Sequence, residues 1–118
     1  MDEYEDEIKV MKALSHPARL AILETLRQGE ACVCHMEAWL GWRQAYISQQ
    51  LMVLREAGLV TDRRDGWNIF YHVVKPEIYA VLDAVNCVTG HTNRLDLPVA
   101  ALKTCPCPHC QEVKASVV

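Results

Sequence analysis

Residues 34–73 read CHMEAWLGWRQAYISQQLMVLREAGLVTDRRDGWNIFYHV, and along this stretch the spacing of apolar residues changes from helical to extended. From Ile47 the apolar residues recur at i, i+4 and i+7, which predicts a helix over about 43–58 with one narrow buried stripe. A shorter helix is predicted over about 34–40, and Gly41 provides the turn between the two. The first half of the stretch therefore predicts two helices joined by a tight turn.

The second half of the stretch predicts a β-hairpin. Residues 59–64 and 67–73 flank Asp65-Gly66, a dipeptide typical of a two-residue turn. One face of the second strand carries Ile69, Tyr71 and Val73. Two helices, a tight turn and a hairpin together predict a winged helix-turn-helix, which is a mainly α fold with a β-hairpin wing. The alternative is a generic small α+β domain.

Three more helices are predicted around this motif. The first covers about 3–14, and the second begins at Ser15 as its N-cap, has Pro17 in its first turn and ends at Gly29. The last opens at Pro76 and carries an apolar stripe made up of Ile78, Val81, Leu82, Val85 and Val88. Because this stripe is too large for the surface of a small monomer, it predicts a homodimer formed through the first and last helices.

Length and composition fit one domain with a short extension. The 118 residues, 51% of them hydrophobic, predict a winged-helix and dimerisation domain over 1–90, followed by a cysteine-rich C-terminal tail over 91–118. No apolar run approaches the length of a membrane span, and the first seven residues carry five acids, unlike a signal peptide. We therefore expect a cytoplasmic protein with no membrane partner. Its six cysteines are expected to be metal ligands or redox sensors rather than structural disulfides.

The net charge of −3 gives no support to nucleic-acid binding by itself. Five of the acids lie in the first seven residues, and the remainder has twelve Lys and Arg against ten Asp and Glu. An acidic arm is thus attached to a mildly basic body, and this distribution does not exclude DNA as a partner.

The outer face predicted for the helix over 43–58 carries hydroxyls and amides, where a merely solvated face would carry Lys and Glu. Hydroxyls and amides hydrogen-bond base edges in the major groove. From this helix we expect DNA contacts by Arg43, Gln44, Tyr46, Ser48 and Gln49. In the wing, Arg63, Arg64 and Trp67 lie beside the turn, where guanidiniums suit phosphates or a minor groove. The alternatives are a plain solvated helix and an ordinary charged turn.

Two groups of cysteines indicate soft-ion chemistry. Cys32 and Cys34 lie at the start of the short helix, where both thiolates can reach one ion only if the backbone there is extended. The tail contains Cys105-Pro106-Cys107-Pro108-His109-Cys110, with three thiols and an imidazole. Either the tail supplies three ligands alone, or it completes a site begun by Cys32 and Cys34. The alternatives are two buried cysteines that act as small hydrophobes and a tail with chance thiols.

These residues resemble the ArsR/SmtB family of metal-responsive winged-helix repressors. The resemblance covers about half of the chain, in residues 13–20 (ALSHPARL), 31–34 (ACVC), 48–51 (SQQL), 54–60 (LREAGLV) and 63–66 (RRDG). It implies a homodimer that binds double-stranded operator DNA when ion-free and leaves it when its sensing site fills. Chains with Cys-Val-Cys at this helix are similar to sensors of arsenite and antimonite, or of cadmium and lead when a further cysteine is present.

The resemblance also assigns roles to residues. It implies that Cys32 and Cys34 are the sensing thiols. It places Gln44, Tyr46, Ser48 and Gln49 at base-reading positions and Arg63 and Arg64 in the wing.

Three departures from the family pattern affect the expected site. The acidic arm has no cysteine, so the extra ligands that cadmium sensors draw from that arm are absent. Val85 stands where the family's zinc site on the last helix would want a histidine beside Asp83, although Asp83, Cys87 and His91 share one face there as a second potential site. Position 50 is Gln where the family often has His, which bears on the operator sequence. The tail is therefore the expected source of a third thiolate.

We accordingly expect a repressor, not an enzyme, that is released by As(III) or Sb(III), with Cd(II), Pb(II) or Zn(II) as alternative ions and no organic small-molecule substrate. Ion binding is expected to straighten or unwind the start of the short helix and to tilt the helix over about 43–58, the recognition helix, out of register with the operator. A second hypothesis is a repressor of the same fold that senses redox state or persulfide. A thiol oxidoreductase is disfavoured, because no Cys-x-x-Cys lies at a strand-to-helix turn. The last hypothesis is a structural zinc tail on a constitutive DNA-binding protein.

Overall fold

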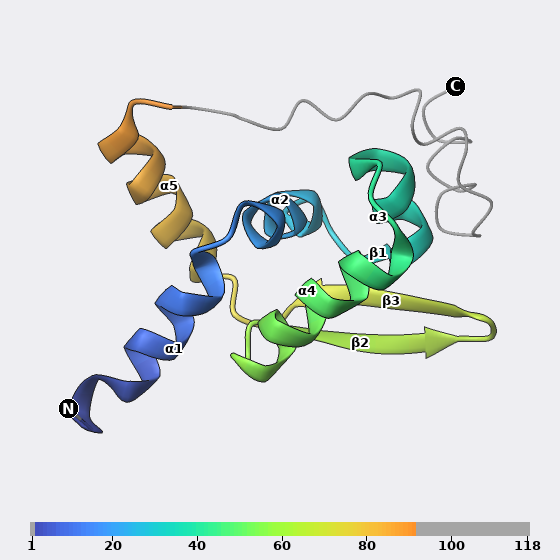
Figure 1. The fold of residues 1–118 in the computed structure, drawn as a ribbon, viewed down its shortest axis with the longest axis horizontal. Coiled ribbons are helices and arrows are strands. Elements are labelled where there is room, and N and C mark those ends of the chain that lie inside the picture. Colours follow the sequence, from blue (N-terminus) through green and yellow to red (C-terminus); the bar gives the residue numbers. More distant parts are fainter. Residues whose placement is uncertain (1, 92–118) are drawn as a thin grey trace.

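The computed structural model describes residues 2–91, which form helices around a small three-stranded sheet (Figure 1). The elements in chain order are η1 (Asp2–Tyr4), α1 (Glu5–Leu14), α2 (Pro17–Leu26), β1 (Ala31–Cys32), α3 (Val33–Leu40), α4 (Gln44–Glu56), β2 (Val60–Asp65), β3 (Asn68–Val73) and α5 (Ile78–Thr89). The predicted mainly α fold with a β-hairpin wing is confirmed. Residues 92–118 lie outside the described residues, so the predicted domain boundary at 90 stays a prediction.

The helix-turn-helix forms where the apolar spacing predicts it. α3 ends at Gly41, whose φ of 73° is a left-handed conformation that favours glycine. α4 begins after Arg43, and Ile47, Leu51 and Leu54 are completely buried. These three side chains join residues of α2, α3 and α5 in one core. α4 is therefore held to the body along this stripe, and its outer face stays exposed.

The sheet differs from the prediction in two ways. β1 adds a third strand, in the antiparallel order β1-β3-β2, and two residues are too few for an alternating pattern to reveal. Asp65 pairs with Asn68, so the hairpin turn consists of Gly66 and Trp67, one residue later than predicted. The reason is backbone geometry, because Gly66, with φ 62°, takes the first turn position, where glycine is preferred.

β3 buries side chains on both of its faces. Tyr71 and Val73 pack against the main core, on the face that the alternation predicts. Phe70 points to the opposite face, is only 2% exposed, and forms a second small cluster with Cys32. This second cluster joins the middle strand to the start of α3.

The termini of α2 were predicted wrongly. His16, not Ser15, is the N-cap: its Nδ1 atom accepts the backbone N–H of Ala18 at 3.1 Å. Ser15 is unsuitable because its hydroxyl donates to the carbonyl oxygen of Lys12, in the last turn of α1. At the other end α2 stops at Leu26, before the predicted Gly29.

α1 and α5 lie at the end of the molecule opposite the hairpin turn (Figure 1). The predicted stripe of α5 divides into two parts, because Ile78 and Leu82 enter the core while the remaining valines are exposed: Val81 45%, Val85 52% and Val88 87%. On α1, Ile8 and Met11 are also exposed. Within residues 2–91, no helix combines the length and the apolar character that a membrane span requires.

Candidate DNA interface and thiol site

The outer face of α4 carries the residues predicted to contact DNA. Gln44, Tyr46 and Gln49 are exposed there, Ser48 is half-buried, and Arg43 is exposed just before the helix. The Tyr46 ring packs edge-on against Trp42 of the preceding turn, with 5.7 Å between ring centroids. This contact restricts the Tyr46 side chain at the start of the helix, where base contacts are usual.

Gln50 does not belong to this outer face and is only 9% exposed. Its Oε1 atom accepts from Nη1 of Arg19 at 3.1 Å, which ties α4 to α2. The same guanidinium donates from Nε to the Ala13 carbonyl at 2.6 Å and from Nη2 to the Lys12 carbonyl at 3.1 Å. The residue that departs from the family pattern at position 50 thus faces the body and has a structural partner.

The two wing arginines have different surroundings. Arg63 donates from Nε to Oε2 of Glu30 at 3.0 Å, and its guanidinium lies 4.8 Å from the centroid of the Phe70 ring. The hydrogen bonds to Glu30 raise the pKa of Arg63 above its ordinary value. Arg64 is exposed and has no ion pair within residues 2–91, and Trp67 at the turn is fully exposed.

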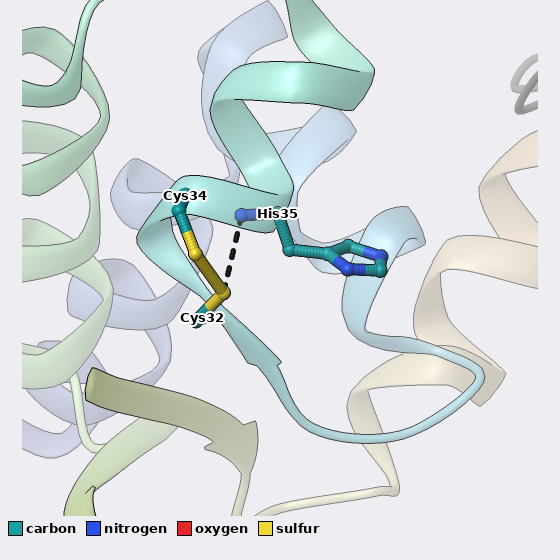
Figure 2. Close-up of a disulfide and its surroundings, with 3 residues drawn as sticks. All are labelled: Cys32, Cys34 and His35. Atoms are coloured by element: carbon teal, nitrogen blue, oxygen red, sulfur yellow. Dashed lines mark hydrogen bonds between the residues drawn. A yellow bond between two sulfur atoms is a disulfide. The ribbon is translucent and has the colours of Figure 1, made fainter. Parts of the chain in front are cut away.

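Cys32 and Cys34 flank the start of α3, as Figure 2 shows. Cys32 ends β1 with φ −82° and ψ 163°, so the extended backbone that a shared site requires is present. Where thiolates were expected, the two sulfurs are joined in a disulfide, so binding of an ion would first require reduction. The Sγ atom of Cys32 also caps α3, because it accepts the backbone N–H of His35 at 3.2 Å.

The imidazole of His35 points away from the two sulfurs (Figure 2). It is buried and packs against the Trp39 ring with 3.7 Å between centroids, so it contacts the protein interior and not the sulfurs. Among residues 2–91, no group of three or more His, Cys, Asp and Glu side chains is placed to hold a metal ion. Two sulfurs alone do not complete a site, and the candidate ligands Cys105, Cys107 and Cys110 lie outside the described residues.

The second potential site, on α5, is not formed. Asp83 is paired with Arg27 of the α2 C-terminus, Nη2 to Oδ1 at 2.9 Å. Cys87 is an exposed free cysteine. His91 follows the end of the helix at Gly90, so helical spacing no longer aligns it with the other two.

Glu30 and Phe70 are the neighbours of the site that sequence reasoning missed. Glu30 occupies a loop position, and nothing in its neighbourhood in the sequence indicates a partner 33 residues away. Phe70 is the only phenylalanine in the chain, and it lies on the face of β3 that the alternation predicts to be outward. The signal in the sequence was one large apolar residue on the strand face that should carry polar residues, which indicates a second buried cluster on that face.

Comparisons with known proteins agree with this geometry. Residues 16–62 match the sequence profile described as "Bacterial regulatory protein, arsR family". The biofilm growth-associated repressor of Agrobacterium fabrum is 42% identical over 89 residues, which cover 75% of this chain and 76% of that protein. The chain belongs to the ArsR family. As an ArsR-family protein it is a transcriptional regulator and not an enzyme.

Solved structures of other ArsR-type proteins share the fold. Rv0081 from Mycobacterium tuberculosis is 35% identical with a TM-score of 0.69, over 76% of this chain and 91% of that one. Mb0332 from Mycobacterium bovis, described as a homodimeric winged helix-turn-helix DNA-binding domain, is 28% identical with a TM-score of 0.67, over 79% of this chain and 91% of that one. The predicted winged helix-turn-helix is thereby confirmed.

Proposed function

We propose that this ArsR-family protein is a repressor that binds operator DNA as a homodimer and is released when As(III) or Sb(III) binds cysteine thiolates. The proposed ligands are Cys32, Cys34 and one thiolate from Cys105, Cys107 and Cys110. The proposed DNA contacts are Arg43 just before α4, then Gln44, Tyr46, Ser48 and Gln49 on α4, and Arg64 and Trp67 in the wing. The observation that carries the proposal is the adjacency of two sulfurs at the start of the helix that packs against the recognition helix.

The homodimer is supported by the surface of α1 and α5. Val81, Val85 and Val88 are exposed on α5, and Met11 is 62% exposed on α1. Both helices lie at the same end of the molecule (Figure 1), and the related Mb0332 is described as homodimeric. A two-fold dimer through this end would hide the apolar side chains and would point both wings outward.

The donor set favours a soft, trivalent ion. A dithiol reductant would give two electrons and two protons to the Cys32–Cys34 disulfide and become a disulfide itself, which leaves two neighbouring thiols whose thiolates prefer soft ions. Three sulfurs satisfy As(III) or Sb(III), whereas tetrahedral Zn(II) and Cd(II) would want a fourth ligand. Within residues 2–91 only two sulfurs lie together, and we propose that the third comes from Cys105, Cys107 or Cys110.

The coupling between ion and DNA would start at the cap of α3. When the Cys32 sulfur binds an ion, it loses electron density that it now offers to the N–H of His35. α3 contributes Met36 to the core that also holds Ile47 and Leu51 of α4, so a shift of α3 displaces the recognition helix. Coupling free energies between two sites are typically about 1–3 kcal/mol. Ion binding would then weaken the affinity for operator DNA by roughly 5–150-fold.

The test uses the reduced full chain and a duplex that it selects from a random-sequence pool. Titration with arsenite should weaken binding to this duplex, and X-ray absorption should give three sulfur neighbours for arsenic. In the variant with Cys105, Cys107 and Cys110 all changed to Ser, X-ray absorption should give only two sulfur neighbours for arsenic. Unchanged duplex affinity in arsenite would eliminate arsenite as the effector, and parallel titrations with cadmium, lead and zinc would test the alternative ions.

A second candidate is supported by the disulfide itself. A repressor that senses oxidants or persulfide would use the Cys32–Cys34 pair as its switch, since both sulfurs already lie within bonding reach. Oxidation of the two thiols would pass two electrons and two protons to the oxidant. Release of the selected duplex by diamide without any ion, with a loss of two mass units for the peptide carrying both cysteines, would favour this candidate over the ion sensor.

A further inference from the structure

The side chain of Arg63 turns back from the wing toward the segment that carries the thiols. Its guanidinium holds both oxygens of the Glu30 carboxylate, with Nε to Oε2 at 3.0 Å, and it covers the Phe70 ring at 4.8 Å. Oδ2 of Asp65 lies 3.9 Å from Nη1, the third nitrogen of the same guanidinium. Two of its nitrogens already donate to Glu30 and nearby carboxylates offset its charge, so Arg63 is less suited than an unpaired arginine to bind a phosphate.

Glu30 and Phe70 both border Cys32. Glu30 immediately precedes β1, and Cys32 ends that strand. Within the sheet, Cys32 pairs with Phe70 and Phe70 pairs with Arg63, so the three residues lie side by side across the three strands. Cys32 and Phe70 are 1% and 2% exposed and form a cluster apart from the main core. Close packing in such a cluster transmits small displacements to its neighbours.

Arg64 has the opposite arrangement. Neighbouring residues of a strand point to opposite faces, so Arg64 does not share the Glu30 and Phe70 side of β2. It is exposed and forms no ion pair in the part of the chain that the structure describes. Its charge therefore remains available to DNA, in contrast to that of Arg63.

We propose that Arg63 is a positioning residue that links the state of the Cys32 and Cys34 sulfurs to the wing through Phe70 and Glu30, and that Arg64 alone of this pair contacts the DNA backbone. This inference rests on the proposed function and adds a second route by which the state of the sulfurs could affect DNA binding. The first route passes from the cap of α3 to α4, and the second passes across the sheet from β1 to the wing. Cutting the Glu30–Arg63 pair should therefore reduce coupling while the thiols still react.

The first measurement needs no DNA. Hydrogen exchange of wing peptides within 60–73 is followed in the full chain in three states: reduced, oxidised by diamide to the disulfide, and reduced with arsenite. In the natural chain we expect wing exchange rates in the reduced state to differ from those of at least one other state by about threefold or more. In Glu30→Gln and in Arg63→Gln, which break the same pair from its two ends, this difference should fall to within about 1.5-fold.

The second measurement uses the selected duplex. Glu30→Gln and Arg63→Gln should reduce the ratio of duplex affinities with and without effector, whereas the matched control Arg64→Gln should weaken binding equally in both states and leave the ratio unchanged. Thiol titration and arsenite binding should be the same in all three variants.

The inference is overturned if wing exchange is the same in every sulfur state, if the difference persists in both Glu30→Gln and Arg63→Gln, or if Arg63→Gln behaves like Arg64→Gln. A wing that responds to the sulfur state while the duplex stays bound would contradict the proposed function and leave this inference standing.

Discussion

Gln49 and Gln50 are neighbours in the chain, but one points to solvent and the other toward the body of the protein. Gln49 is exposed on the outer face, whereas Gln50 is 9% exposed and accepts a hydrogen bond from Arg19. One amide is thus free to meet a base edge, and the other joins two helices. Two adjacent glutamines are therefore expected to have different roles, with Gln49 contacting DNA and Gln50 stabilising the fold.

Substitution of these two glutamines by alanine should give opposite results. Gln50→Ala removes the acceptor of Arg19 and should lower the free energy of unfolding by about 1 kcal/mol, measured by urea denaturation. Gln49→Ala should change that free energy by less than about 0.5 kcal/mol. It should instead weaken binding to the selected duplex by about 1–3 kcal/mol, and mostly at one base pair. Equal losses of stability in the two variants would show that Gln49 is not directed outward.

The cap formed by Cys32 can be tested apart from its thiol chemistry. In reductant, Cys32→Ala removes the acceptor of the His35 N–H and should lower the free energy of unfolding by about 1 kcal/mol more than Cys34→Ala does. Cys32→Ser retains an acceptor at this position, so it should recover part of the loss. Arsenite binding should be weakened in all three variants. A loss for Cys34→Ala as large as that for Cys32→Ala would argue against a capping role.

The charge of Arg64 predicts a salt effect. If Arg64 contacts a phosphate, Arg64→Gln should weaken binding to every duplex by a similar factor. The slope of log affinity against log salt concentration should fall by about 1 per contact. The matched control is Lys75→Gln, which removes an exposed cation outside the wing and α4 and should leave the slope unchanged. A change in base preference with an unchanged slope would place Arg64 on a base edge instead.

The exposed stripe of α5 predicts the oligomeric state. Val85 is 52% exposed, so Val85→Glu creates no clash within one chain but would bury a charge in the proposed dimer. Sedimentation should show dimers for the natural chain and monomers for Val85→Glu, with unfolding behaviour that now depends less on concentration. Gln28→Glu adds the same charge at an exposed position elsewhere and should remain dimeric. A dimeric Val85→Glu would place the interface on another surface.

Local patterns in the sequence predicted the elements well and the connections between them poorly. Helical spacing of apolar residues predicted α4, because a buried stripe along a helix requires that spacing. The three residues of this stripe, Ile47, Leu51 and Leu54, are completely buried. The two-residue strand β1 has no such signature, although it brings Cys32 against Phe70. Its formation depends on β3, which lies far along the chain, and short-range spacing carries no information on that pairing.

The same distinction applies to the candidate site. Chemical type, helical spacing and the family resemblance together singled out Cys32, Cys34 and the residues of the outer face of α4, and the structure places them at the start of α3 and on an exposed face of α4. Pairings between distant residues, such as Arg63 with Glu30 and Arg27 with Asp83, were not predicted. A charged side chain at the surface has several possible partners, and only the folded geometry selects among them.

The burial of Cys32 fixes a direction for thiol exchange at the disulfide. Cys32 is 1% exposed while Cys34 is only half-buried, so an incoming thiolate reaches Cys34 first and forms a mixed disulfide there. Cys32 then departs as a thiolate at the N-terminus of α3, where it accepts the His35 N–H and is stabilised by the helix. α3, the helix proposed to respond to the state of the sulfurs, thus also stabilises the Cys32 thiolate that leaves when the disulfide is reduced.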